Sequence, residues 1–148
     1  MLSLRHFLIT FSLCIFTVSS VWAQNDFAQT AAKEPGAKVT ASGLVFRSLQ
    51  DGQGASPSAT DKVKVHYRGT FPDGKEFDSS YKRNLAIDFP LNGVIPCWTE
   101  GVQLMKIGGK AKLTCPPSIA YGARGAGGVI PPNATLQFEV ELIAIAGK

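Results

Sequence analysis

The sequence offers few side chains suited to act as a nucleophile, a general base or a metal ligand. It contains two histidines and three cysteines, and no two cysteines have the spacing typical of zinc sites. His66 lies between Val65 and Tyr67 in an alternating segment, which places it on the outer face of an expected strand. No GxSxG, Walker or GxGxxG motif occurs. The pattern argues against hydrolytic and nucleotide chemistry, and we expect no metal site.

The residues that stand out are aromatic, and most of them adjoin a glycine or a charged residue. They are Tyr67, Phe77, Trp98, Tyr121 and Phe138. Rings at such positions belong either to ordinary core packing or to an apolar cleft with a few polar tips. Periodicity alone leaves both interpretations open.

Several short elements must position these rings. Val63, Val65 and Tyr67 alternate with charged and polar residues, which predicts a half-buried strand. Residues 111–115 and 135–145 show the same alternation, whereas residues 99–105 are the one expected helix. Strands joined by short turns, with a single helix, predict an α+β fold in which a curved antiparallel β-sheet wraps around one short helix.

Length and composition limit the class of protein. The chain has 148 residues, which is the length of about one domain. Hydrophobic residues make up 45% and charged residues 18%, so the chain can bury a core. The net charge of +4 raises the question of nucleic-acid binding. However, lysines and arginines are spread along the chain and mixed with acids rather than clustered, so we expect no nucleic-acid partner.

The first residues have the features of a secretory signal peptide. Arg5 and His6 precede an apolar stretch, which ends in Val21-Trp22-Ala23. We expect residues 1–23 to be the signal peptide, cleaved after Ala23. The alternative is a retained membrane anchor, but an apolar stretch of about 15 residues is shorter than the ~20 that span a bilayer. We therefore expect no stable membrane insertion after cleavage.

The segment after the expected cleavage site is small and polar. Residues 24–41 include the breaker Pro35-Gly36 and few large apolar side chains. This composition predicts a flexible N-terminal arm at residues 24–41, followed by the folded domain at residues 42–148.

Three runs of sequence together resemble the FK506-binding-protein (FKBP) type of peptidyl-prolyl cis-trans isomerase. They are VHYRGTFPDGKEFDSSYKR, GVIPCWTEGVQLMKIGGKAKLTCPP and AYGARGAGGVIPPNATLQFEVELI, and the resemblance covers about residues 43–145. A signal peptide ahead of a short arm makes the chain similar to exported bacterial members, with the periplasm as the expected location. Larger exported relatives carry a long helical dimerisation region, and residues 24–41 are too short for one, so we expect a monomer.

The resemblance also implies a binding pocket. Its catalytic residues would be Tyr67, Phe77, Asp78, Trp98, Tyr121 and Phe138, with Trp98 as the floor. Its further substrate-binding residues would be Arg83, Ile87, Val94, Ile95, Val129 and Ile130. The backbone N–H of Ile95 and the hydroxyl of Tyr121 would bond ligand carbonyls. Two positions depart from the family: Ile87 stands where an aromatic residue is common, and Ala126-Gly127 where His-Pro is common.

The implied activity is rotation about Xaa-Pro bonds in exported, proline-containing unfolded or partly folded polypeptides, with FK506 and rapamycin-type macrolides as inhibitors. A planar amide is dipolar and its twisted transition state less so, so an apolar pocket favours the twisted form without any cofactor. The alternative function is a non-catalytic chaperone or binding module with the same fold. Loss of Trp98, Phe138 or Asp78 would favour that alternative, and all three are present.

The expected export of the chain bears on the oxidation state of its cysteines. Cys14 would leave with the signal peptide, so Cys97 and Cys115 remain in an oxidising compartment. We expect a disulfide between them, where the helix begins above an inward-facing strand position. The alternatives are two buried free thiols, or Cys97 as a reactive thiolate at the helix N-terminus.

Overall fold

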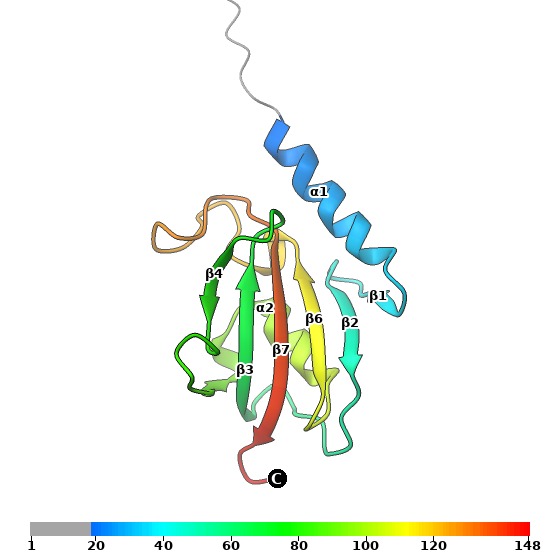
Figure 1. Cartoon of the computed structure of the whole chain (residues 1–148), viewed down its shortest axis with the longest axis vertical. Helices are drawn as coiled ribbons and strands as arrows, with labels where there is room; N and C mark the ends of the chain where they lie inside the picture. Colours follow the sequence, from blue (N-terminus) through cyan, green and yellow to red (C-terminus); the bar gives the residue numbers. More distant parts are fainter. Residues whose placement is uncertain (1–18) are drawn as a thin grey trace, which may run out of the picture.

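Alternating apolar and polar residues build the sheet, as the sequence predicts. The computed structural model describes residues 19–148, and Figure 1 shows their course. The strands are β1 (Ala37–Val39), β2 (Val45–Gln50), β3 (Lys62–Thr70), β4 (Glu76–Ser79), β5 (Ile87–Pro90), β6 (Lys110–Cys115) and β7 (Leu136–Ile145). The helices are α1 (Ser19–Ala32) and α2 (Pro96–Gln103), with short 3-10 turns at Leu91–Gly93 and Pro117–Ile119.

All pairings in the seven-stranded sheet are antiparallel, in the order β1-β2-β6-β7-β3-β4, and β5 also pairs with β3. The last strand, β7, therefore lies at the centre, between β6 and β3 (Figure 1). Tyr67 opposes Val140 across the β3–β7 pair, and Leu113 opposes Phe138 across the β6–β7 pair. These registers bring side chains from distant parts of the sequence onto one inner face.

The helix α2 covers that inner face, and its start and its packing have local causes. It begins at Pro96, earlier than the expected residue 99, because proline in the first turn loses no helical hydrogen bond and already has a helical φ. Gly101 faces Leu113 on β6, and a Cβ at this glycine would lie 2.8 Å from the leucine side chain. Glycine therefore permits the close approach of helix and sheet.

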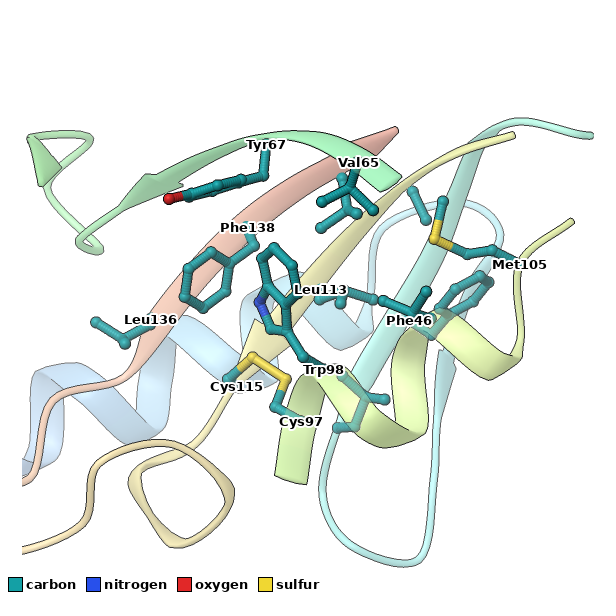
Figure 2. Packing of buried hydrophobic residues seen from close by; sticks show 14 of the residues in the cluster. Phe46, Val65, Tyr67, Cys97, Trp98, Met105, Leu113, Cys115, Leu136 and Phe138 are labelled. Carbon is teal, nitrogen blue, oxygen red and sulfur yellow. A yellow bond between two sulfur atoms is a disulfide. The ribbon is translucent and has the colours of Figure 1, made fainter. Parts of the chain in front are cut away.

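One cluster of buried residues lies between α2 and the sheet. Figure 2 shows part of it, with residues from β2, β3, α2, β6 and β7. Leu44, Val63, Val65, Leu113, Val140 and Leu142 have no exposed surface. Burying a side chain of this size contributes about 1.5–3 kcal/mol. The predicted α+β architecture, a curved antiparallel sheet around a short helix, is confirmed.

The expected flexible arm at residues 24–41 is corrected by the structure. Residues 24–32 continue α1, and Ala37–Val39 form β1, which pairs with β2. Ala31 is buried, and Glu34 forms ion pairs with Arg47 on β2 and, at 3.5 Å, with Lys112 on β6. The composition is misleading here because a short edge strand, a small alanine and one glutamate make the contacts to the sheet.

Most of the expected signal peptide lies outside the described residues, and the expected cleavage site at Ala23 falls within α1. Within residues 19–148, no helix combines the length and the apolar character that a membrane crossing requires.

Candidate functional site

Three aromatic rings meet the indole of Trp98, and all of them do so edge to face. The ring centroids of Tyr67, Phe89 and Phe138 lie 5.3, 5.5 and 5.4 Å from that of Trp98, with interplanar angles of 83, 78 and 90°. This is the preferred geometry of aromatic pairs, worth about 0.5–1.5 kcal/mol each beyond burial. Figure 2 shows Tyr67 and Phe138 close to Trp98. The rings therefore hold one another in fixed orientations.

With Phe77, five rings face inward at this site. Four strands and one helix supply them. Tyr67 comes from β3, Phe77 from β4, Phe89 from β5, Trp98 from the first turn of α2 and Phe138 from β7. They surround a pocket of about 470 Å³. The pocket is lined by Tyr67, Phe77, Asp78, Phe89, Gly93, Val94, Ile95, Trp98, Tyr121 and Phe138. We call it the aromatic pocket.

One wall of the aromatic pocket carries a hydrogen-bonded ion pair. The Tyr67 hydroxyl donates to Asp78 Oδ2, and Arg83 donates to Asp78 Oδ1 at 2.5 Å and to the Tyr67 hydroxyl at 3.0 Å. The guanidinium also lies 5.8 Å from the centre of the Tyr67 ring. Arg83 does not itself line the pocket, so its position indicates that it orients Asp78 and Tyr67 from behind.

The same contacts set the charge state of this wall. Burial acts to raise the pKa of Asp78, but hydrogen bonds from Tyr67 and Arg83 outweigh it, and the pKa is lowered overall. The pKa of Tyr67 is raised, by burial first and by the Asp78 carboxylate second. At neutral pH the aspartate is therefore ionised and the phenol is neutral.

The mouth of the pocket offers two hydrogen-bond donors. No residue among those described accepts a hydrogen bond from the backbone N–H of Ile95, whose carbonyl instead accepts from Trp98 N at 2.9 Å. The side chain of Tyr121 is 40% exposed, and within residues 19–148 its hydroxyl has no partner either. Both donors are thus available to a bound peptide carbonyl.

The indole nitrogen of Trp98 is buried and has no oxygen or nitrogen partner in the described part of the chain. Figure 2 shows it on the side of the indole that faces Phe138, whose ring is perpendicular to the indole. The floor of the pocket is therefore an indole whose N–H has no partner among the described residues.

The structure brings together eight of the residues named from the sequence. They are Tyr67, Phe77, Asp78, Val94, Ile95, Trp98, Tyr121 and Phe138. Sequence reasoning missed Phe89 and Gly93. Ile87 does not line the pocket, although it shares a strand face with Phe89. The larger ring of Phe89 reaches Tyr67 and Trp98, whereas the shorter Ile87 side chain packs against the core beside Val65. The signal available in the sequence was Phe89 itself, an aromatic residue two positions after Ile87 and therefore on the same strand face.

Val129 and Ile130, expected as further substrate-binding residues, do not line the aromatic pocket. They line a second hollow of about 1040 Å³ between the β3–β4 turn and the loop at residues 124–132. We call this the outer hollow. It adjoins the aromatic pocket through Phe77, whose ring contacts Phe71 of the outer hollow on one side and Phe138 on the other.

Cys97 and Cys115 are joined by a disulfide, with their Cα atoms 5.8 Å apart. Both residues are fully buried. The bond ties the start of α2 to the end of β6, directly next to the floor residue Trp98 (Figure 2).

Within residues 19–148, no group of three or more histidine, cysteine, aspartate or glutamate side chains is placed to hold a metal ion.

Comparisons with known proteins agree with this geometry. A family model described as FKBP-type peptidyl-prolyl cis-trans isomerase matches residues 53–143. The chain is 51% identical over 119 residues to the FKBP-type 22 kDa peptidyl-prolyl cis-trans isomerase of Escherichia coli (strain K12), covering 80% of this chain and 58% of that protein. It is 49% identical over 120 residues to FkpA of the same organism, covering 81% of this chain and 44% of FkpA.

Solved structures give the same result. The crystal structure of FkpA from Escherichia coli has a TM-score of 0.80 at 48% identity, over 82% of this chain and 57% of that chain. A peptidyl-prolyl cis-trans isomerase from Pseudomonas syringae has a TM-score of 0.79 at 41% identity, over 84% of this chain and 92% of that chain. This chain spans about half the length of the curated relatives that it matches.

Proposed function

Because the chain belongs to the FKBP-type peptidyl-prolyl cis-trans isomerase family, we propose that it accelerates rotation about Xaa-Pro bonds in exported polypeptides. The observation that carries the proposal is the aromatic pocket, in which Trp98 forms an apolar floor among three perpendicular rings. The pocket offers shape and hydrogen-bond donors, and its one carboxylate, Asp78, is engaged by Tyr67 and Arg83, which suits a reaction that breaks no covalent bond.

The reaction needs only a change of environment around the imide. Resonance gives the planar bond a rotation barrier of ~18–20 kcal/mol, and uncatalysed exchange takes tens of seconds or more. Twisting the bond reduces its dipole, so a dry apolar pocket disfavours the planar form relative to the twisted one. A millionfold acceleration corresponds to about 8 kcal/mol of preferential binding to the transition state.

The polar groups of the pocket then orient the substrate. The Ile95 N–H and the Tyr121 hydroxyl are free to hold the carbonyls that flank the proline ring above Trp98. Asp78 forms a fixed anionic wall because Tyr67 and Arg83 both donate to it. In this proposal Tyr67, Phe77, Asp78, Trp98, Tyr121 and Phe138 form the reacting site. Phe89 joins them as an additional wall.

The substrates are proline-containing unfolded or partly folded polypeptides, and FK506 and rapamycin-type macrolides are inhibitors that occupy the same pocket.

We place the protein in the periplasm. The apolar N-terminal segment and the buried Cys97–Cys115 disulfide support an oxidising compartment outside the cytosol. The protein acts as a monomer, in keeping with the contacts that α1 and Glu34 make with the chain's own sheet.

A protease-coupled assay on Xaa-Pro tetrapeptides tests the activity. We expect catalysis that stops when one equivalent of FK506 or rapamycin is added. The second candidate function, a non-catalytic chaperone with this fold, predicts a different outcome: the protein would suppress aggregation of an unfolded client and bind the macrolide, yet leave the isomerisation rate unchanged.

A further inference from the structure

The outer hollow has no part in the reaction described so far, although it is larger than the aromatic pocket. Its apolar lining includes Phe71, Val129, Ile130 and Ala134. Val129 is 56% exposed, so much of its apolar surface is open to a partner. Figure 1 shows that the loop at residues 124–132 and the β3–β4 turn project from the same end of the sheet.

The loop that forms one wall of the outer hollow is fixed by its own backbone. Ala126 and Ile130 form an isolated β-bridge, and Asn133 N donates to Gly122 O at 2.8 Å. Gly125 adopts a φ of +67°, and a Cβ there would lie 2.2 Å from the Ile130 carbonyl oxygen. Only glycine fits at this point, and the bridge and the backbone hydrogen bond join the two ends of the loop.

The aromatic pocket and the outer hollow are separated by one shared wall of aromatic rings. The Phe71 and Phe77 rings lie 4.9 Å apart, and Phe77 meets Phe138 edge to face at 5.6 Å. One side of this stack belongs to the aromatic pocket and the other to the outer hollow. An extended polypeptide advances about 3.3 Å per residue, so a chain held in the first site reaches the second within a few residues.

The rim of the outer hollow is basic. Lys75 and Arg124 are exposed, and neither takes part in an ion pair among residues 19–148. The one acid of the lining, Asp73, already accepts the backbone N–H of Lys75 at 2.8 Å as part of the turn. An apolar floor beneath two unpaired cations is complementary to an apolar side chain that stands next to a carboxylate.

We propose that the outer hollow is an accessory site for the client polypeptide, which binds an apolar residue adjacent to an acidic one a few residues from the proline in the aromatic pocket. The inference rests on the proposed function, since it assigns the second site to the same substrate chain. It gives the protein a sequence preference outside the Xaa-Pro unit.

The test compares peptides of ten residues that share one Leu-Pro unit. One series carries Leu-Glu at two to six residues on either side of the proline, a second carries Leu-Lys, and a third carries Ser-Glu. We expect the best Leu-Glu peptide to have a Kd roughly fivefold lower, and a kcat/KM roughly fivefold higher, than its Leu-Lys and Ser-Glu counterparts. A change of this size is what a partly exposed ion pair or one buried side chain contributes.

A charge-reversed protein then locates the effect. Lys75→Glu with Arg124→Glu is expected to abolish the Leu-Glu preference while leaving kcat/KM for a short Leu-Pro tetrapeptide unchanged. The matched control is Lys38→Glu with Lys106→Glu, which changes the net charge equally at exposed lysines outside both sites. This control is expected to retain the preference.

The outcomes separate the two proposals. Equal Kd values for the three peptide series in the unmodified protein would overturn the accessory site, and so would a preference that survives the double reversal. Lack of catalysis on the tetrapeptide would contradict the proposed function. The Kd comparison would still decide whether the outer hollow binds the acidic peptide.

Discussion

The aromatic pocket and the N-terminal segment at residues 19–39 are attached to the same sheet in different ways. The pocket draws on five elements, and each of the five rings that they supply contacts at least one other ring. The N-terminal segment depends on a three-residue edge strand, one buried alanine and the two ion pairs of Glu34. We therefore expect the pocket to be cooperative, so that one deletion affects several contacts, and the N-terminal segment to tolerate change.

The largest effect is expected at the centre of the pocket. Trp98→Ala removes the ring that Tyr67, Phe89 and Phe138 contact, and deleting a buried aromatic side chain costs about 3–5 kcal/mol of the free energy of unfolding. Urea denaturation followed by circular dichroism measures it. Leu104→Ala, at an exposed position just after α2, is the control and should change stability by less than about 1 kcal/mol. Similar losses in both variants would contradict a cooperative pocket.

The next effect concerns the disulfide beside the pocket floor. Cys97 and Cys115 are separated by 18 positions, and closing a loop of this length contributes about 3 kcal/mol in the chain-entropy model. The variant Cys97→Ala with Cys115→Ala should lose this amount in denaturation, with activity retained where the variant is folded. Alkylation of the protein, purified without reductant and denatured, should give no modified residue among Cys97 and Cys115 before reduction and two after it. Two alkyl groups without reductant would rule the bond out.

Substitution of Asp78 is expected to have a smaller effect, which lowers the rate of isomerisation and leaves the protein folded. Asp78→Ala should lower kcat/KM on Xaa-Pro peptides at least tenfold, equivalent to about 1.4 kcal/mol, because Tyr67 and Arg83 lose the group that orders them. Circular dichroism confirms folding. Asp78→Asn is the matched control, which keeps the shape and should be partly active. Full activity of a folded Asp78→Ala protein would remove this residue from the site.

The lowered pKa of Asp78 also predicts a pH dependence. A carboxylate with a lowered folded-state pKa stabilises the protein fully above its unfolded pKa of about 3.9, and this contribution is lost as the pH falls through the folded-state value. Activity should therefore stay level from neutral pH to about pH 5 and decline only below that range. A half-maximal rate near pH 6 would show that another group controls the pocket wall.

The smallest effect is expected at the N-terminal segment. Glu34→Gln removes both partly exposed ion pairs, with Arg47 and Lys112, and should reduce stability by about 1 kcal/mol or less. Isomerase activity should be unchanged, since none of these three residues lines the aromatic pocket. Thermal melting and the tetrapeptide assay measure the two quantities. A loss of activity in this variant would mean that the N-terminal segment and the pocket are coupled.

The two regions also differ in how well the sequence predicted them. The strands of the pocket carry strict alternation, as in Lys62–Thr70, so their inward-facing rings were identifiable. Period two shows which face a side chain takes, but not how far it reaches. The resemblance assigned Ile87 to the pocket wall, and the alternation could not show that Phe89, on the same face, reaches Trp98 instead.

The remaining differences arise from contacts that are long-range in sequence. Glu34 and Lys112 are separated by 78 positions, and nothing local marks them as partners. Small, polar residues 24–41 therefore looked like a flexible arm although part of the segment is anchored. Val129 and Ile130, expected from the resemblance to bind substrate, line the outer hollow and not the aromatic pocket, and their role in binding stays a prediction.

The most direct test of the account is NMR exchange spectroscopy on a Leu-Pro tetrapeptide with a small amount of the protein. Without catalyst, cis and trans signals interconvert over tens of seconds or longer and show no exchange cross-peaks on the sub-second timescale. With the protein present, we expect strong cis–trans cross-peaks, which disappear when FK506 fills the aromatic pocket. Peptide signals that broaden or shift on binding, while cis–trans exchange remains as slow as in the free peptide, would contradict this expectation.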